Sequence, residues 1–184
     1  MRINGPWKIK SSQEKYSNEY FKVNEDQVIR PDGKDGILSR VELRPGASAL
    51  PIDDNGFVYL IRQFRYTIED YSIEVAGGGM VNGEKPIEAA KRELKEELGI
   101  EAKEWIDLGR LNPFTTAIKS PHYIFLVKKL KFGKTIGDPT EDIKPMKVTL
   151  EQAVNMVMDG KITNGPSCVL ILKVEKYLKD KYPM

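Results

Sequence analysis

The sequence predicts an α/β domain, with helices packed on a mixed β-sheet and a short N-terminal β-strand segment in front. Short apolar runs bounded by turn residues recur before residue 86 and again after residue 104, and they are typical of strands. Segments with helical apolar spacing begin at Pro86 and recur toward the C-terminus. Strands in the middle, with helices at the centre and the end, favour a layered α/β or α+β domain.

Residues 1–43 form the predicted N-terminal strand segment. The pieces "EYFKV", "DQVIR" and "SRVEL" have strand character, and "RPDGKDG" between the last two predicts a hairpin. This segment is too short to bury a core of its own. We therefore expect its strands to join the main domain or to exchange with a second copy of the chain.

Residues 44–184 form the predicted main domain. "ASALPI", "DDNG" and "FVYLIRQF" predict strand, turn and strand, and "YSIEVAGG" predicts a strand that runs into glycines. A helix is predicted from Pro86 to a stop at Gly99. "WIDLGRL" and "HYIFLVKKL" predict two strands around a loop. Thr149 is the expected cap of a second helix, and the C-terminal tail predicts a third.

Composition excludes several classes of protein. Lys+Arg 29 against Asp+Glu 27 leaves a nearly neutral chain, so nothing supports nucleic-acid binding through a basic field. The apolar runs are too short to span a bilayer, and the start of the chain lacks a secretory h-region, so we expect no membrane partner. The single Cys168 excludes an internal disulfide and a cysteine zinc cluster. A cytoplasmic setting is the expectation.

Three glutamates stand within little more than one turn of the predicted helix. At about 100° per residue, Glu93, Glu96 and Glu97 fall on one flank of the apolar stripe, and the lysines Lys91 and Lys95 fall on the other. Like charges at this spacing weaken a helix. A merely solvated charged face is the ordinary alternative. Against it, the acids border the core and a glycine-rich loop leads into the helix, which favours a hard divalent cation such as Mg²⁺.

The stretch around these acids resembles the Nudix box, which reads G, five residues, E, seven residues, then R-E-U-x-E-E-x-G-U with U a bulky aliphatic. The match has no defect. It runs through Gly78, Glu84, Arg92, Glu93, Leu94, Glu96, Glu97, Gly99 and Ile100. So fully specified a pattern is much more specific than a lone glycine motif. The resemblance implies the Nudix fold, an α/β/α sandwich with a mixed sheet, and Mg²⁺-dependent cleavage of a nucleoside diphosphate linked to another moiety.

The resemblance also implies residue roles. Metal ligation carries over to Glu93, Glu96 and Glu97, and the backbone carbonyl before the box glycine adds Gly77. Arg92 is expected to orient these acids, and Glu84 has the place of the residue that supports the loop–helix geometry. Mg²⁺ is the expected cofactor, with Mn²⁺ as a substitute. Metal at these oxygens would neutralise the diphosphate and activate water.

Most of the chain further resembles the ADP-ribose pyrophosphatase group, through "RPGASALPI", "LIRQFR" before the box and "EVAGG" entering it. This resemblance assigns Arg65 to a substrate phosphate, and we place Glu74 on the substrate side as well. Glu141 is expected to be the catalytic carboxylate on a later loop, with Asp142 as the reserve. A strand-edge ion pair for Arg65 and an ordinary acidic surface loop are the alternatives.

Substrate choice is less sharply defined by the residues. The stretch "LNPFTTAIKSPHYIF" lacks the Ser-Pro-Gly character that ADP-ribose enzymes commonly carry after the box. ADP-ribose is the leading expectation, with GDP-mannose, UDP-glucose or a non-catalytic nucleotide sensor as alternatives. Trp7 is either a wall for the nucleobase or a packing residue. His122 is expected to end a strand, and a homodimer formed through residues 1–43 is expected from the resemblance.

Overall fold

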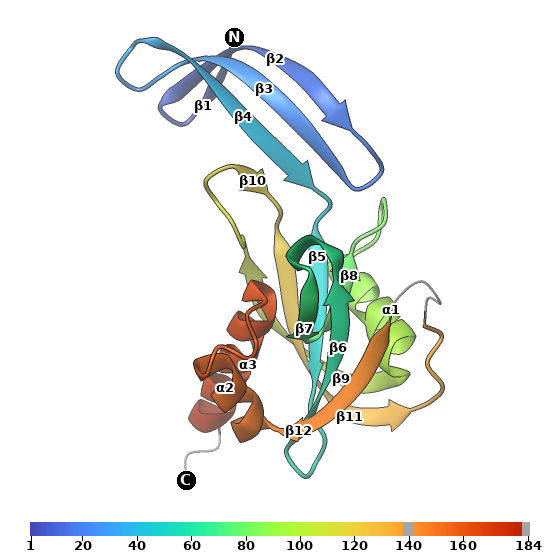
Figure 1. Ribbon diagram of the computed structural model, residues 1–184. Helices are drawn as coiled ribbons and strands as arrows, with labels where there is room; N and C mark the ends of the chain where they lie inside the picture. Colours follow the sequence, from blue (N-terminus) through green and yellow to red (C-terminus); the bar gives the residue numbers. More distant parts are fainter. Residues whose placement is uncertain (138–141, 182–184) are drawn as a thin grey trace. The chain divides into compact units, whose positions relative to one another are not determined.

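The computed structural model describes residues 1–137 and 142–181 (Figure 1). The chain divides into two compact units. Unit 1 consists of Met1–Pro45 with Asn112–Pro121, and unit 2 consists of Gly46–Leu111 with His122–Met184. No helix among the described residues is both long and apolar enough to cross a membrane.

Unit 1 is a five-stranded sheet with the order β1-β2-β3-β4-β10. Neighbouring strands are antiparallel except for β10, which pairs parallel to β4. The hairpin expected around "RPDGKDG" is confirmed as the β3–β4 connection. The strands span β1 Arg2–Asn4, β2 Trp7–Ser17, β3 Phe21–Ile29, β4 Asp35–Leu43 and β10 Ile118–Lys119.

Unit 1 buries little apolar surface, as its composition predicts. Of its hydrophobic side chains, only Ile9 and Val28 are buried, together with the carboxylate of Asp26. The strand β2 was missed from the sequence because its exposed residues after Ile9 are mostly polar and show no apolar alternation. The two pieces "EYFKV" and "DQVIR" belong to the single strand β3.

Unit 2 contains two sheets. The first has the order β8-β5-β11-β9, with β5 and β11 parallel and the other pairs antiparallel, so the predicted mixed sheet is confirmed. The second is antiparallel with the order β12-β6-β7. The strands span β5 Gly46–Pro51, β6 Phe57–Arg65, β7 Asp70–Glu74, β8 Ala76–Gly79, β9 Ile100–Leu111, β11 His122–Phe132 and β12 Ile143–Thr149.

The strand–turn–strand predicted over "ASALPI" to "FVYLIRQF" does not close into a regular hairpin. A single bridge between Ile52 and Val58 joins the two arms, and β5 and β6 belong to different sheets. The reason is burial, because all six residues of β5 are buried and both of its edges are paired. A short 3₁₀ turn, Tyr66–Ile68, links β6 to β7.

Helices cover unit 2 from two sides, as Figure 1 shows: α1 lies on one side of the sheets, and α2 with α3 on the other. One apolar core packs Leu50, Leu60 and Leu126 against α2 and α3. A second packs Ala49, Phe125 and other sheet residues against α1. The helices span α1 Pro86–Leu98, α2 Leu150–Met158 and α3 Gly165–Lys181. The predicted α/β/α arrangement is therefore observed.

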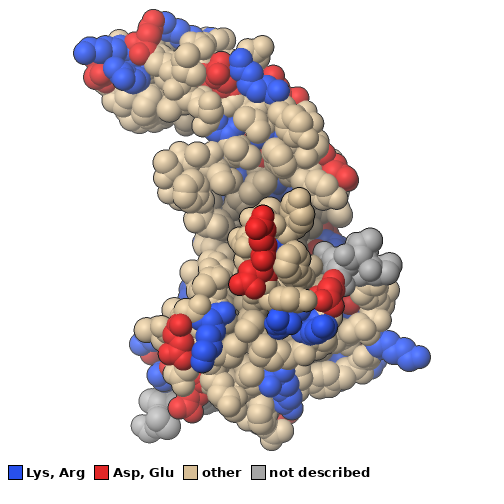
Figure 2. All heavy atoms as spheres, viewed as in Figure 1, with Lys and Arg blue, Asp and Glu red and all other residues tan. Residues whose placement is uncertain are grey.

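Charged side chains are mixed on the surface. On the face shown in Figure 2, lysines and arginines are interspersed with acids, and most of the surface carries neither. This distribution matches the formal net charge of +2 for the whole chain. A single-sign field that would attract a polyanion is absent from the described residues on that face.

Candidate active site on helix α1

Helix α1 presents the box residues, and local signals fix where it begins and ends. Pro86 stands at its first turn, and the Glu88 carboxylate accepts the backbone N–H of Lys85 at 3.1 Å. Gly99 ends the helix with φ 64°, a left-handed conformation that favours glycine. Both boundaries agree with the predicted helix. The apolar stripe, including Ala90, Leu94 and Leu98, is buried in the second core.

Arg92 is the centre of the charged flank. Its Nη1 donates to Glu93 at 2.7 Å and to Glu96 at 3.1 Å. Its Nε and Nη2 donate to the two carboxylate oxygens of Glu84 at 3.1 and 3.2 Å, and Nη2 also donates to the carbonyl of Gly79. Through this one guanidinium, residues of the loop and of the helix are linked in a single network.

Arg92 and Glu84 each stabilise the charged form of the other. The hydrogen bond from Arg92 lowers the pKa of the Glu84 carboxyl, although burial opposes the shift. In return, Glu84 first and then Glu93 raise the pKa of the Arg92 guanidinium. Glu84 also accepts the backbone N–H of Val81 at 3.0 Å, so it ties the loop to the helix. That contact is the one expected of a residue supporting the loop–helix geometry.

Glu97 and Glu93 each lie against a glycine of β8. The Glu97 carboxylate is buried and accepts the backbone N–H of Gly77 at 2.9 Å. A Cβ atom on Gly78 would lie 2.4 Å from Glu93 Oε1, so only glycine leaves room for that carboxylate. The glycines before the helix therefore allow the acids of α1 to reach the sheet backbone.

The oxygen atoms of the box residues are the type of ligand that a hard cation prefers. Glu93, Glu96, Glu97 and the Gly77 backbone supply only oxygen, which suits Mg²⁺ or Mn²⁺. As the side chains stand, no three acidic, histidine or cysteine side chains in residues 1–137 and 142–181 gather closely enough to hold a metal ion. Glu93 and Glu96 are turned to Arg92 instead. A cation at these oxygens requires the two carboxylates to turn toward it.

The lysines of α1 are engaged on the other flank. Lys95 pairs with Glu101 at 2.8 Å, and the Lys91 ammonium lies 5.6 Å from the centroid of the Trp105 ring. Neither contact involves an acid of the box. The segregation of charge expected from the helical wheel is thus present in the structure.

Arg65 and Glu74 form one bidentate ion pair. Arg65 Nε lies 2.9 Å from Glu74 Oε1, and Nη2 lies 2.7 Å from Oε2. Glu74 is buried, whereas Arg65 is about one third exposed. The ion pair is the alternative that the sequence left open for Arg65. It also joins the two residues that were assigned to the substrate.

Glu141 and its reserve Asp142 are the expected carboxylates of the later acidic loop. Glu141 lies outside the described residues, so the structure says nothing of its position. Asp142 is exposed, accepts a long 3.4 Å hydrogen bond from the Tyr71 hydroxyl and lies 3.8 Å from the Lys144 ammonium. Asp142 is therefore held beside β7 and β12 by weak contacts.

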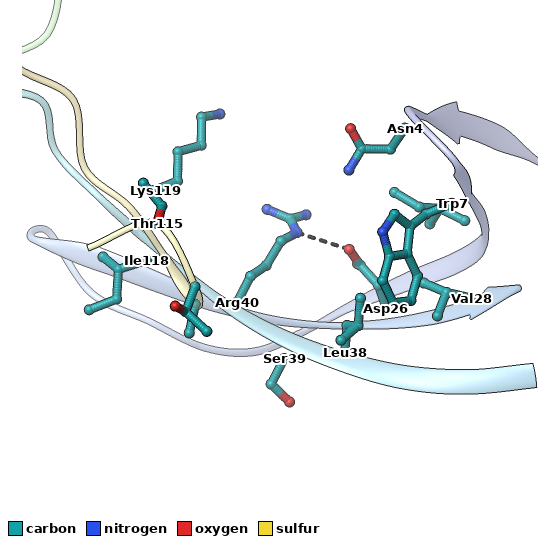
Figure 3. Close-up of a pocket in the computed structure, with 13 residues that line it drawn as sticks. Asn4, Trp7, Asp26, Val28, Leu38, Ser39, Arg40, Thr115, Ile118 and Lys119 are labelled. Atoms are coloured by element: carbon teal, nitrogen blue, oxygen red, sulfur yellow. Dashed lines mark hydrogen bonds and ion pairs between the residues drawn. The ribbon is translucent and has the colours of Figure 1, made fainter. Parts of the chain in front are cut away.

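Trp7 lines a pocket that lies wholly within unit 1. The pocket has a volume of about 430 Å³, and its walls include Ile9, Val28 and Leu38 (Figure 3). At its floor Arg40 Nε donates to Asp26 Oδ2 at 2.9 Å. The other oxygen of this carboxylate, Oδ1, is buried, and Ser12 stands opposite Asp26 in the β2–β3 register.

Asp26 remains ionised despite its burial. Burial works against the charged form, but the Ser12 hydroxyl and the Arg40 guanidinium outweigh it and lower the pKa of this carboxyl. The hydrogen bonds from these two side chains therefore offset the cost of burying the charge. Sequence reasoning missed Asp26 and Arg40, because nothing in "DQVIR" or "SRVEL" distinguishes them from exposed strand residues.

Sequence reasoning also missed a polar pair in unit 2. His122 begins β11, as expected of a strand-end residue, but its ring is only partly exposed and Nε2 lies 2.7 Å from the Ser48 hydroxyl oxygen. Burial lowers the pKa of His122 to about 4, although Glu74 opposes the shift, so the imidazole is neutral near pH 7. The signal that was available is a serine between alanines in the buried run "ASALP".

Comparison with protein families agrees with this geometry. Residues 42–166 match the NUDIX domain, and residues 7–37 match the nucleoside diphosphate sugar hydrolase N-terminal domain. The first match contains all of α1 and the glycines before it, and the second contains Trp7 and Asp26. The two matches together cover most of both units.

Individual proteins are similar over nearly the whole chain. A Bacillus subtilis protein named ADP-ribose pyrophosphatase is 30% identical over 165 residues, which cover 85% of each chain. A Mycobacterium tuberculosis protein of the same name is 28% identical and covers 89% of this chain and 81% of its own. A crystal structure of an ADP compounds hydrolase superposes with a TM-score of 0.84 at 21% identity and covers 100% of both chains, which shows the shared fold.

Proposed function

This chain belongs to the NUDIX family and is an enzyme of the Nudix pyrophosphatase type, and from that premise we propose that it hydrolyses the diphosphate bond of a nucleoside diphosphate sugar. ADP-ribose is the proposed substrate, with AMP and ribose 5-phosphate as products. The observation that carries the proposal is the complete set of box acids on one flank of α1. Arg92 holds Glu93 and Glu96, and the Gly77 backbone N–H holds Glu97. A domain that only senses nucleotides does not need these acids.

Hydrolases of the NUDIX family generally use divalent metal ions. We propose Mg²⁺, with Mn²⁺ as a substitute, held by the carboxylates of Glu93, Glu96 and Glu97 and by the carbonyl of Gly77. The ion supplies charge stabilisation for the phosphoryl oxygens. Arg92 keeps Glu93 and Glu96 in place before the ion binds, and without the ion it offsets part of their mutual repulsion.

Substrate contacts are assigned to the remaining residues. The Arg65 guanidinium is oriented by Glu74, and in the proposal it grips a phosphate group of the substrate. Glu141 is the proposed base that takes a proton from the attacking water. Asp142 remains the reserve, although its contacts with Tyr71 and Lys144 engage its carboxylate elsewhere.

Trp7 is the residue proposed to stack on the nucleobase. Its indole offers a flat apolar wall in the pocket of unit 1.

A homodimer is proposed from unit 1. Phe21 and Val23 on β3 stand directly opposite Leu43 and Val41 on β4, so all four side chains share one face of the sheet. We call these four residues the β3–β4 stripe. Because unit 1 buries so few apolar side chains, a partly exposed stripe of this kind suits the self-complementary interface of two copies.

A cytoplasmic location remains the expectation from the single cysteine.

A substrate panel tests the proposed function. ADP-ribose, GDP-mannose, UDP-glucose, dinucleoside polyphosphates and nucleoside triphosphates are incubated with the enzyme and Mg²⁺, and products are separated by ion-exchange chromatography. The highest kcat/KM is expected for ADP-ribose, with AMP and ribose 5-phosphate in equal amounts. A higher kcat/KM for GDP-mannose or UDP-glucose would assign a different nucleotide sugar to this site.

Glu97→Gln is the variant for the panel. The substitution keeps the side-chain shape but removes the negative charge, so kcat should fall by about 10² or more. Lys95→Gln changes a residue on the opposite flank, where the side chain pairs with exposed Glu101, and it should keep wild-type turnover. Unchanged kcat in Glu97→Gln would refute the metal assignment.

A further inference from the structure

Ser48 and His122 are a polar pair in the first sheet of unit 2, one side chain buried and the other partly buried, and the proposed function does not use them. Ser48 is 4% exposed and lies between Ala47 and Ala49, which are fully buried. Its Oγ lies 2.7 Å from His122 Nε2. Because β5 and β11 are parallel neighbours, the two side chains meet although 74 positions separate them in the sequence. A hydrogen-bonded pair of this kind constrains both strands.

The Ser48 side chain is pressed against the backbone of β8. Ser48 stands opposite Gly77 in the antiparallel β5–β8 register. A Cβ atom on Gly77 would lie 2.1 Å from Ser48 Oγ and 2.7 Å from Ser48 Cβ. The hydroxyl group therefore occupies the place where a side chain of residue 77 would stand. Any change in the position of Ser48 is transmitted directly to the Cα atom of Gly77.

His122 is itself held in one orientation. A Cβ atom on Gly46 would lie 2.4 Å from Nδ1 of the imidazole, so the ring packs onto the bare backbone of β5. This contact leaves Nε2 directed at Ser48, with which it forms its hydrogen bond. The hydrogen bond from the ring thus favours one side-chain torsion of Ser48, and the backbone of β8 limits the space for any other torsion.

Gly77 connects this pair to the box acids. Its backbone N–H donates to Glu97 Oε2 at 2.9 Å. Contacts therefore run without a gap from His122 to Ser48, then to Gly77 and to the buried carboxylate of Glu97. In the proposed function, the carbonyl of the same glycine is a metal ligand. Groups that orient ligands in this way typically affect metal affinity about 10- to 100-fold.

We propose that Ser48 and His122 are positioning residues for the divalent-cation site, because they fix the Gly77 backbone and, through its N–H, the Glu97 carboxylate. This inference rests on the proposed function, since it takes Gly77 and Glu97 as metal ligands. Neither residue touches the cation or the substrate. Their effect is on how well the ligands are arranged before the cation arrives.

Direct binding of Mn²⁺, measured by electron paramagnetic resonance on the substrate-free protein, tests the proposal. Ser48→Ala and His122→Leu should each weaken Mn²⁺ binding about tenfold, the lower end of the range for groups outside the ligand sphere. His122→Gln should bind Mn²⁺ within about twofold of wild type, because its terminal amide reaches the place of Nε2 and can bond Ser48. Rescue by glutamine is not expected if the ring only fills space.

Two controls separate positioning from general destabilisation. Thr149→Ala removes the hydrogen bond that caps α2, which costs about 1 kcal/mol of stability, and it should leave Mn²⁺ affinity unchanged. In a double-mutant cycle, Ser48→Ala should weaken Mn²⁺ binding much less when Glu97→Gln is already present. The reason is that the contacts from Ser48 through Gly77 act on the Glu97 carboxylate.

The outcomes distinguish this inference from the proposed function. If wild type binds Mn²⁺ and Glu97→Gln weakens it, but Ser48→Ala binds as wild type does, the positioning role is overturned and the metal site stands. If wild type and Glu97→Gln bind Mn²⁺ equally, both are overturned. If His122→Leu fails to fold, Ser48→Ala decides alone, because alanine matches the two flanking residues and leaves β5 packed.

Discussion

At the scale of single residues, His122 couples folding to pH. Burial of the imidazole lowers its pKa to about 4 from its ordinary value of 6.5. The unfolded chain therefore binds a proton that the folded chain does not, at every pH between these two values. Its contribution to stability is fully present above about pH 6.5, and it is lost as the pH falls toward 4.

The pH dependence of unfolding checks this coupling. Between pH 7 and pH 4, wild type should lose up to about 3 kcal/mol of unfolding free energy that His122→Gln does not lose. Urea denaturation of both proteins at several pH values gives the difference, and acidic groups common to both cancel. Parallel stability curves for the two proteins would mean that the histidine takes up its proton at the same pH in the folded and unfolded states, so its pKa is not lowered.

At the scale of elements, α1 concentrates charge that Arg92 only partly neutralises. Glu93, Glu96 and Glu97 share one flank with a single arginine, which also bonds Glu84. Since like charges on one flank repel, a bound divalent cation should stabilise the folded protein even without substrate.

A thermal melt with and without Mg²⁺ tests this stabilisation. At a concentration ten times its dissociation constant, a ligand adds about 1.4 kcal/mol of unfolding free energy, or roughly 3–5 °C in Tm for a chain of this size. Glu97→Gln should show a smaller shift, and equal ionic strength of NaCl is the salt control. If Tm does not respond to millimolar Mg²⁺, the metal is held mainly by the phosphates of the substrate.

Elements with strong local signals could be predicted from the sequence. The limits of α1 follow from Pro86 and Gly99, and the charge segregation on it follows from helical geometry alone. The Ser48–His122 contact could not be predicted, because it depends on the parallel pairing of two strands far apart in sequence. The same holds for Asp26 and Arg40, whose contact depends on the β3–β4 register.

At the scale of the whole molecule, the two units differ in how they are stabilised. Unit 2 has two apolar cores, whereas the five strands of unit 1 bury only two apolar side chains. A sheet with so small a core gains stability when its apolar face is covered. The β3–β4 stripe is the part of unit 1 that we propose is covered by a second copy.

A charge placed in the stripe tests the dimer. Leu43 is 37% exposed, so Leu43→Asp should preserve the chain's fold while placing an unpaired carboxylate in the proposed interface. Size-exclusion chromatography with light scattering should show a dimer for wild type at micromolar concentration and a shift to monomer for the variant. Lys22→Asp, on the opposite face of β3, is the matched control and should remain dimeric. A wild-type monomer at this concentration contradicts the proposal.

Unit 1 is assembled from two separate stretches of chain, since the strand β10 comes from the segment between β9 and β11 and pairs with β4. A gene shortened to begin at residue 46 would therefore still encode β10, but without the strand that completes its hydrogen bonds. Exchange of the N-terminal region between relatives faces the same constraint, because residues 112–121 must be exchanged with it. In protein engineering, unit 1 must therefore be transferred as two separate segments of unequal length, because the N-terminal segment alone does not make up the unit.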